Sequence, residues 1–170
     1  MVPTQLLQGL AACPHLTHLS LQSLRAGANK HISSWLPAVR SLDLGGASSY
    51  ECAQLLAKLG PQLTHLSWHN RVTVEAAADA IGACANLQSI ELHSIGDTEL
   101  PVLLRLQHLV RVSCDEWVVE ADAGSSSART CAWEQLVVRG GAPGQPNMLA
   151  GVPLGIRELV VQGSRADARL

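Results

Sequence analysis

A short pattern of alternating apolar and polar residues returns at regular intervals along the chain. The pattern is a hexapeptide with apolar residues at its first, fourth and sixth positions, and its first copy is Leu16–Leu21. Seven copies occur, with the fourth position at residues 19, 42, 66, 90, 112, 136 and 159. All 21 template positions hold an apolar residue or Cys, and 18 of the 21 intervening positions are polar. This period-two alternation predicts a β-strand with one buried face at each copy.

The intervals between the copies leave room for a turn and a short helix. Successive fourth positions lie 22 to 24 residues apart. Residues 49–60 have the apolar stripe of an α-helix, made by Cys52, Leu55, Leu56 and Leu59. Similar stripes predict helices over 74–84 and after Asp97 or Thr98, and only a turn or two near 32–36 and 148–152. Repetition at this interval favours a stack in which each strand is one rung.

The strand, turn and helix within about 23 residues resemble a leucine-rich repeat. The resemblance covers residues 4–164, and Cys13–Leu16 and Cys84–Leu87 resemble its ribonuclease-inhibitor-like and F-box-associated types. The family's usual Asn or Cys, three residues past the hexapeptide, is replaced here by Leu24, Ala47, Arg71, Ile95, Trp117, Gly141 and Ser164. The resemblance implies an α/β solenoid of about seven repeats, with a parallel concave sheet and short convex helices.

In such a solenoid, the third and fifth hexapeptide positions and the residue after the hexapeptide form three columns on the concave face. We expect contacts to a partner from His18, Ser20, Ser41, Asp43, His65, Ser67, His69, Ser89, Glu91, His93, Arg111, Ser113 and Asp115. The resemblance implies that this face recognises another protein, as a substrate-receptor or scaffold segment. An F-box-like role in substrate selection for a ubiquitin ligase rests on the resemblance alone, because these residues contain no F-box segment.

Histidines on the same face give an alternative interpretation. His69 and His93 come directly after consecutive hexapeptides and Asp115 comes after the next one, so the three should be lateral neighbours. Imidazoles beside a carboxylate can bind a divalent metal ion. The His69–His93–Asp115 column is therefore a candidate metal-dependent site, although no closely spaced metal motif accompanies it.

Other chemistry-bearing patterns favour structural roles. Trp68 and Trp133 occupy core template positions, Trp35 lies on a helical stripe, and Trp117 stands at the replaced Asn position, so core packing is predicted for all four. The glycine-rich run 140–144 lacks the ending of a phosphate-binding loop. Neither a G-x-S-x-G nor an H-E-x-x-H motif occurs. We therefore expect neither enzymatic activity nor a cofactor.

Composition narrows the partners and the compartment. The 170 residues suit one domain, and 12 basic against 14 acidic residues give a net charge of −2, which does not favour nucleic-acid binding. No apolar run reaches the length of a membrane span, and the first residues lack the basic stretch of a secretory signal. Five cysteines without a C-x-x-C pair indicate a reducing compartment, the cytoplasm, with the nucleus also compatible.

Two segments fall outside the repeat pattern. Residues 120–130 are small and polar, which predicts a flexible loop in place of one convex helix. The nine residues after the seventh hexapeptide do not form an amphipathic cap. A solenoid must cover its open ends, so we expect residues 1–170 to be a single arc from a longer array. A neighbouring repeat or domain would then dock at the C-terminal end.

Overall fold

The computed structural model describes residues 13–22, 36–45, 49–69, 75–119, 130–140 and 152–162. Residues 120–129 of the predicted loop, the predicted turns near 32–35 and 148–151, Trp35 and the segment after Gln162 lie outside this part. Thr130, the last residue of the predicted loop, forms a β-bridge with Leu154.

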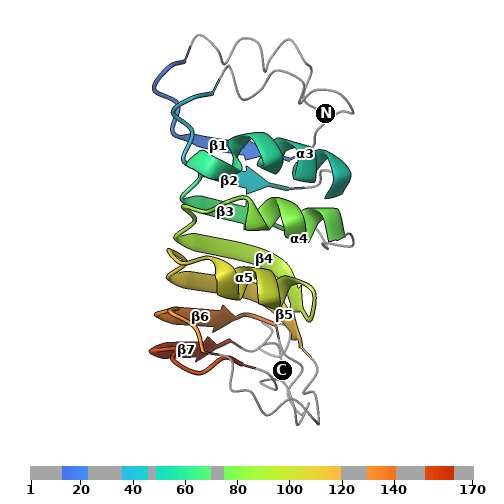
Figure 1. The fold of residues 1–170 in the computed structure, drawn as a ribbon, viewed down its shortest axis with the longest axis vertical. Helices are drawn as coiled ribbons and strands as arrows, with labels where there is room; N and C mark the ends of the chain where they lie inside the picture. Colours follow the sequence, from blue (N-terminus) through green and yellow to red (C-terminus); the bar gives the residue numbers. More distant parts are fainter. Residues whose placement is uncertain are drawn as a thin grey trace, which may run out of the picture.

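The strands form one parallel sheet whose spatial order is the order of the chain (Figure 1). Seven strands are described: β1 (His18–Leu21), β2 (Ser41–Leu44), β3 (His65–Trp68), β4 (Ser89–Gly96), β5 (Arg111–Val118), β6 (Gln135–Val138) and β7 (Glu158–Val161). The predicted hexapeptide strands and their sequential parallel pairing are confirmed. This α/β arrangement is compatible with a solenoid.

The apolar fourth positions of the hexapeptides lie side by side across the sheet. Leu42 pairs with Leu19 on one side and Leu66 on the other, and Leu136 pairs with Leu159 at the far end. One register is kept because a slip by one residue would turn every apolar side chain of a strand to the other face.

A repeated turn leads the chain into each of the first five strands. The amide of the first hexapeptide residue donates to the carbonyl three residues earlier, as from Leu63 to Gly60 at 3.1 Å and from Leu87 to Cys84 at 3.0 Å. The carbonyl of the second residue then accepts two amides of the next strand. The Arg40 carbonyl, for example, accepts from Thr64 at 2.8 Å and from His65 at 3.0 Å. These bonds fix how each repeat enters the sheet.

Short helices cover one face of the sheet (Figure 1). They are α3 (Ser49–Leu59), α4 (Glu75–Gly82) and α5 (Glu99–Arg105), with the 3-10 turn η3 (Gly60–Gln62) directly after α3. All three helices fall where apolar stripes predict them. None of the helices in the described ranges is long and apolar enough to cross a membrane.

The core lies between these helices and the inward side of the sheet. The fourth and sixth hexapeptide positions of β1 to β6 are buried, as are Leu55, Leu56 and Leu59 of α3. Trp68 and Trp133 are fully buried, as predicted, and Trp117 is half-buried against the core. Leu159 and Val161 of β7 differ, since they occupy core template positions yet are 42% and 48% exposed. Among the described strands, β7 has β6 as its only neighbour, so these side chains have a strand beside them on one side only.

Strands β4 and β5 continue beyond their hexapeptides. Ser94, Ile95 and Gly96 pair with Glu116, Trp117 and Val118. Ile95 and Trp117 each come three residues after the hexapeptide of their strand, and Ile95 is buried. An apolar residue at this position can stay in the pleat and pack on the core, which accounts for the longer strands.

Candidate partner-binding surface

The face of the sheet opposite the helices carries all thirteen residues proposed as partner contacts. Strand pairing places them in three columns, as the alternation of side chains requires. None of the thirteen is buried. Five of them are exposed and the other eight half-buried; the exposed five are His18, Ser20, His65, His69 and Arg111. This surface is called the open face below.

The structure brings together two members of the predicted histidine column. His93 Nδ1 lies 3.2 Å from Asp115 Oδ2. His69 is oriented differently, because its Nε2 lies 2.9 Å from Ser67 Oγ and 3.9 Å from Asp43 Oδ1. In the described ranges, no group of three or more His, Cys, Asp or Glu side chains could hold a metal ion. Of the predicted His69–His93–Asp115 column, the structure therefore brings only His93 and Asp115 together, and two residues are fewer than the three or four protein ligands of a typical zinc site.

Lateral hydrogen bonds link neighbouring strands across the open face. Ser20 Oγ donates to Asp43 Oδ2 at 2.8 Å, joining β1 to β2. Gln135 Nε2 donates to Glu158 Oε2 at 2.7 Å, joining β6 to β7. Such bonds hold polar side chains in fixed positions before any partner arrives, which lowers the ordering cost of binding.

Three residues of this face that take part in side-chain contacts were not predicted from the sequence. Arg139 pairs with Glu91 across β5, and Gln135 and Glu158 form the bond just described. All three occupy column positions of the sixth and seventh repeats. The rule that selected the other residues would have found them if it had been applied beyond the fifth repeat.

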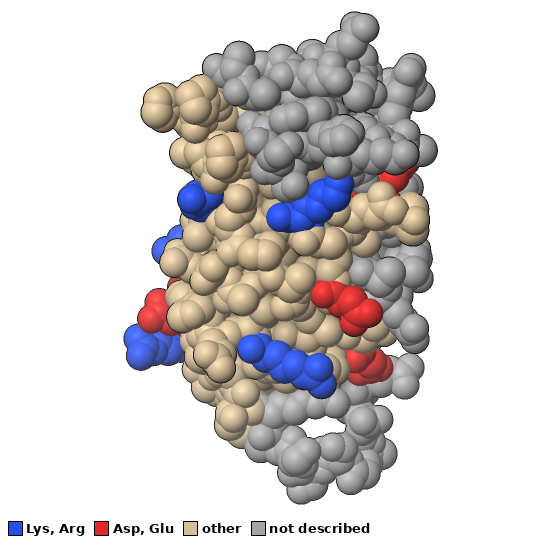
Figure 2. All heavy atoms as spheres, turned by 45° about the horizontal axis from the view of Figure 1, so that its top comes forward, with Lys and Arg blue, Asp and Glu red and all other residues tan. Residues whose placement is uncertain are grey.

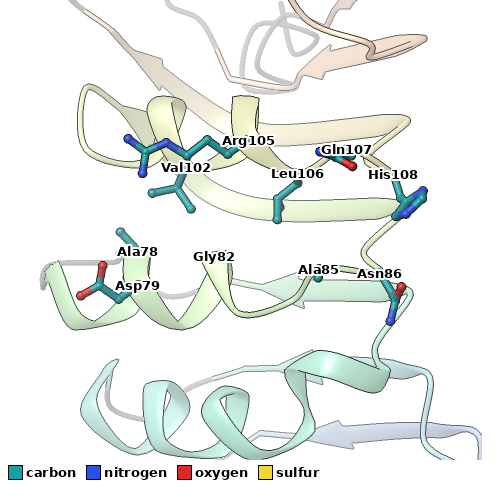
Figure 3. Close-up of a pocket in the computed structure, with 10 residues that line it drawn as sticks. All are labelled: Ala78, Asp79, Gly82, Ala85, Asn86, Val102, Arg105, Leu106, Gln107 and His108. Carbon is teal, nitrogen blue, oxygen red and sulfur yellow. The ribbon is translucent and has the colours of Figure 1, made fainter.

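A groove between α4 and α5 was also not predicted (Figure 3). It has a volume of about 440 Å³ and is lined by Ala78, Asp79, Gly82, Ala85, Asn86, Val102, Arg105, Leu106, Gln107 and His108. Val102 on α5 and Leu106 directly after α5 point toward α4 and the turn that follows it, where Ala78, Gly82 and Ala85 are small (Figure 3). The small residues Ala78, Gly82 and Ala85 are the sequence signal that could have indicated it. On the face drawn in Figure 2, basic and acidic side chains are scattered among uncharged ones and do not gather into one patch of a single sign.

The cysteines behave as structural residues. All five are free thiols. Burial raises the pKa of Cys52, Cys84 and Cys114 to about 12. Because the thiolate is the reactive form, these three side chains are poor nucleophiles. Cys84 instead donates a hydrogen bond to the carbonyl of Ala80 at 3.4 Å.

The sequence and the structure were compared with those of known proteins. Neither a scan of protein-family models nor searches of curated proteins and solved structures found a match to this chain. The candidate site therefore rests on the structure alone, and the open face with its polar columns is the largest of the polar surfaces described above.

Proposed function

We propose that the chain is a leucine-rich-repeat arc that acts as a protein-binding module, with the open face as its recognition surface. The observation that carries this proposal is the in-register pairing of seven hexapeptide strands, which exposes three polar columns on one face. The leucine-rich-repeat assignment rests on the hexapeptide, its interval of 22 to 24 residues and the helices between β2 and β5.

The physical properties of this face suit a large partner. A sheet anchored on a continuous aliphatic core is rigid, and a row of strands offers an extended surface. Its side chains are mostly Ser, His, Asp, Glu and Arg, which form hydrogen bonds and ion pairs. A binding module of this kind fits a substrate-receptor or scaffold segment in the cytoplasm or nucleus, where five free cysteines would stay reduced.

A pair of matched substitutions tests the proposal. Ser89 begins β4 on the open face, and Ala57 is exposed on α3 on the helix-covered side. Ser89→Trp and Ala57→Trp introduce the same bulky uncharged side chain at small residues on opposite sides. Each variant and the native chain would be used to capture proteins from an extract of the source cells, after circular dichroism has shown equal folding.

The proposal expects the native chain and Ala57→Trp to retain the same protein, and Ser89→Trp to lose it. Retention by Ser89→Trp together with loss by Ala57→Trp would place the interface on the helices. Failure of the native chain to retain any protein above a resin control would also contradict the proposal.

A further inference from the structure

Charged residues differ between the edge where the strands begin and the part of the open face beyond it. The entry edge comprises the turns and strand starts of β1 to β5, residues 13–18, 36–41, 60–65, 84–89 and 106–111, at the left of Figure 1. It holds two arginines and four histidines but no Asp or Glu; these six are His15, His18, Arg40, His65, His108 and Arg111. The carboxylates of the open face over these strands, Asp43, Glu91 and Asp115, lie beyond the entry edge along their strands.

The carboxylates already have partners within the described part of the chain. Asp43 accepts from Ser20 and faces His69, Glu91 pairs with Arg139, and Asp115 pairs with His93. The Arg139 guanidinium therefore neutralises Glu91, and the side chains of Asp43 and Asp115 have hydrogen-bond partners in place.

The two arginines of the entry edge have no such compensation. Arg111 is exposed, and its guanidinium makes no hydrogen bond or ion pair with any described residue. The Arg40 guanidinium donates to the backbone carbonyls of Pro37 and Val39, at 3.0 and 3.1 Å, and these acceptors carry no charge. Positive charge at this edge is thus free to attract an anion.

The same edge is hollowed between the two arginines. One groove of about 530 Å³ is lined by Arg40, Pro61, Gln62, Thr64, Asn86, Gln88 and His108. A second, of about 200 Å³, is lined by His65, Gln88, Ser89, Val110 and Arg111. Gln88 lines both, so the grooves adjoin. Arg40 at β2 and Arg111 at β5 are three strand intervals apart, roughly 14 Å at about 4.8 Å each, a span that about four extended residues cover.

We propose that the entry edge binds an extended acidic peptide segment, whose carboxylates pair with Arg40 and Arg111 while the amides and imidazoles between them bind its backbone. This inference rests on the proposed function and names the chemistry of the partner. The segment is confined to β1–β5, because Glu134 and Glu158 stand at the starts of the next two strands. A protein segment is favoured over nucleic acid because the chain has a net charge of −2 and the edge has only two arginines.

The test uses fluorescence anisotropy with a labelled eight-residue glutamate peptide at low salt, and glutamine and lysine peptides of equal length. The native chain should bind the glutamate peptide alone, with affinity falling as salt is added. Arg40→Gln with Arg111→Gln should weaken binding at least about 5-fold. Arg105→Gln, an exposed arginine on the helix-covered side, is the matched control and should change it less than about 2-fold.

Three results would overturn the inference: equal binding of the glutamine peptide, an undiminished affinity in the double variant, or tighter binding of a single-stranded oligonucleotide. The capture experiment with Ser89→Trp separates this failure from that of the proposed function. Loss of a captured protein in Ser89→Trp without glutamate-peptide binding would mean that the open face recognises a partner of different chemistry.

Discussion

His93 on β4 and Asp115 on β5 form a lateral pair, with Nδ1 and Oδ2 3.2 Å apart although 22 residues separate them in the chain. The interval equals one repeat, so each residue comes directly after the hexapeptide of its own strand. A repeat with fixed register thereby converts a regular spacing in the sequence into contacts between side chains.

A double-mutant cycle on this pair should reveal a small coupling. The two side chains are 28% and 40% exposed, so water and salt screen the interaction. We expect His93→Ala and Asp115→Ala to show a coupling free energy below about 1 kcal/mol in denaturant unfolding, smaller still at high salt. A coupling of several kcal/mol would contradict the exposed geometry of the pair.

Replacing a leucine in the middle of the core with Ala should destabilise the fold far more than the same replacement in the last described strand, β7. Leu42 is 1% exposed at the fourth hexapeptide position, and Leu159 is 42% exposed at the equivalent position of β7. Leu42→Ala removes fully buried methyl groups and should lower the free energy of unfolding by about 2–5 kcal/mol. Leu159→Ala should cost less than about 1.5 kcal/mol. Chemical denaturation measures both, and equal losses would mean that another part of the chain covers Leu159.

The strands, their order and the core could be predicted because each depends on local alternation repeated at one interval. Leu42 and Leu66 face the core for the same reason, and one register satisfies every copy. The lengths of β4 and β5 could not be predicted in this way. They depend on Ile95 and Trp117 packing on the core beyond the hexapeptide, which is a tertiary effect.

The candidate surface was predictable in position but not in its pairings. Strand alternation alone puts His69 and His93 on the open face. Which neighbour His69 contacts depends on side-chain rotamers, and it lies against Ser67 and toward Asp43. The groove between α4 and α5 depends on how far apart two helices pack. The small residues Ala78, Gly82 and Ala85 indicate where room is left, but the sequence does not give the distance between the helices.

Two glycine substitutions should differ in their effects on the stability of the fold. A Cβ on Gly140 would collide with the backbone carbonyl oxygen of Asp115, and neither backbone can move without disturbing the pairing of β5 with β6. Gly82, near the end of α4, has space, because its Cβ would lie 3.4 Å from Val102 Cγ1. Gly140→Ala should therefore lower the melting temperature, at a cost of about 1–3 kcal/mol. Gly82→Ala should leave stability unchanged or raise it by up to about 1 kcal/mol through helix propensity. A loss in Gly82→Ala as large as in Gly140→Ala would argue against this packing of α4 and α5.

Thiol labelling should follow burial. Cys13 is exposed and should react with iodoacetamide first in the native protein at pH 8. Burial raises the pKa of Cys131, which is half-buried and should react more slowly. Cys52, Cys84 and Cys114 should react only after unfolding in denaturant. Mass spectrometry of the labelled peptides gives the order, and rapid labelling of Cys84 in the native state would contradict its burial in the core.

Stability should fall in alkaline solution for the same reason. The pKa of Cys52, Cys84 and Cys114 is about 12 in the folded chain, against 9.0 as the ordinary value. Between these two values the unfolded chain releases thiol protons that the folded chain keeps, so rising pH favours unfolding. The stabilisation is fully present below pH 9 and is lost as the pH approaches 12. Each thiol should account for a loss of about 1 kcal/mol by pH 10.

Unfolding by urea at pH 8 and pH 10 measures the loss, and a variant with all three cysteines replaced by Ala is the control. That variant will be less stable at both pH values because of the cavities. Its loss of unfolding free energy between pH 8 and pH 10 should nevertheless be smaller than that of the native chain. An unchanged difference would mean that groups other than these thiols govern the alkaline transition.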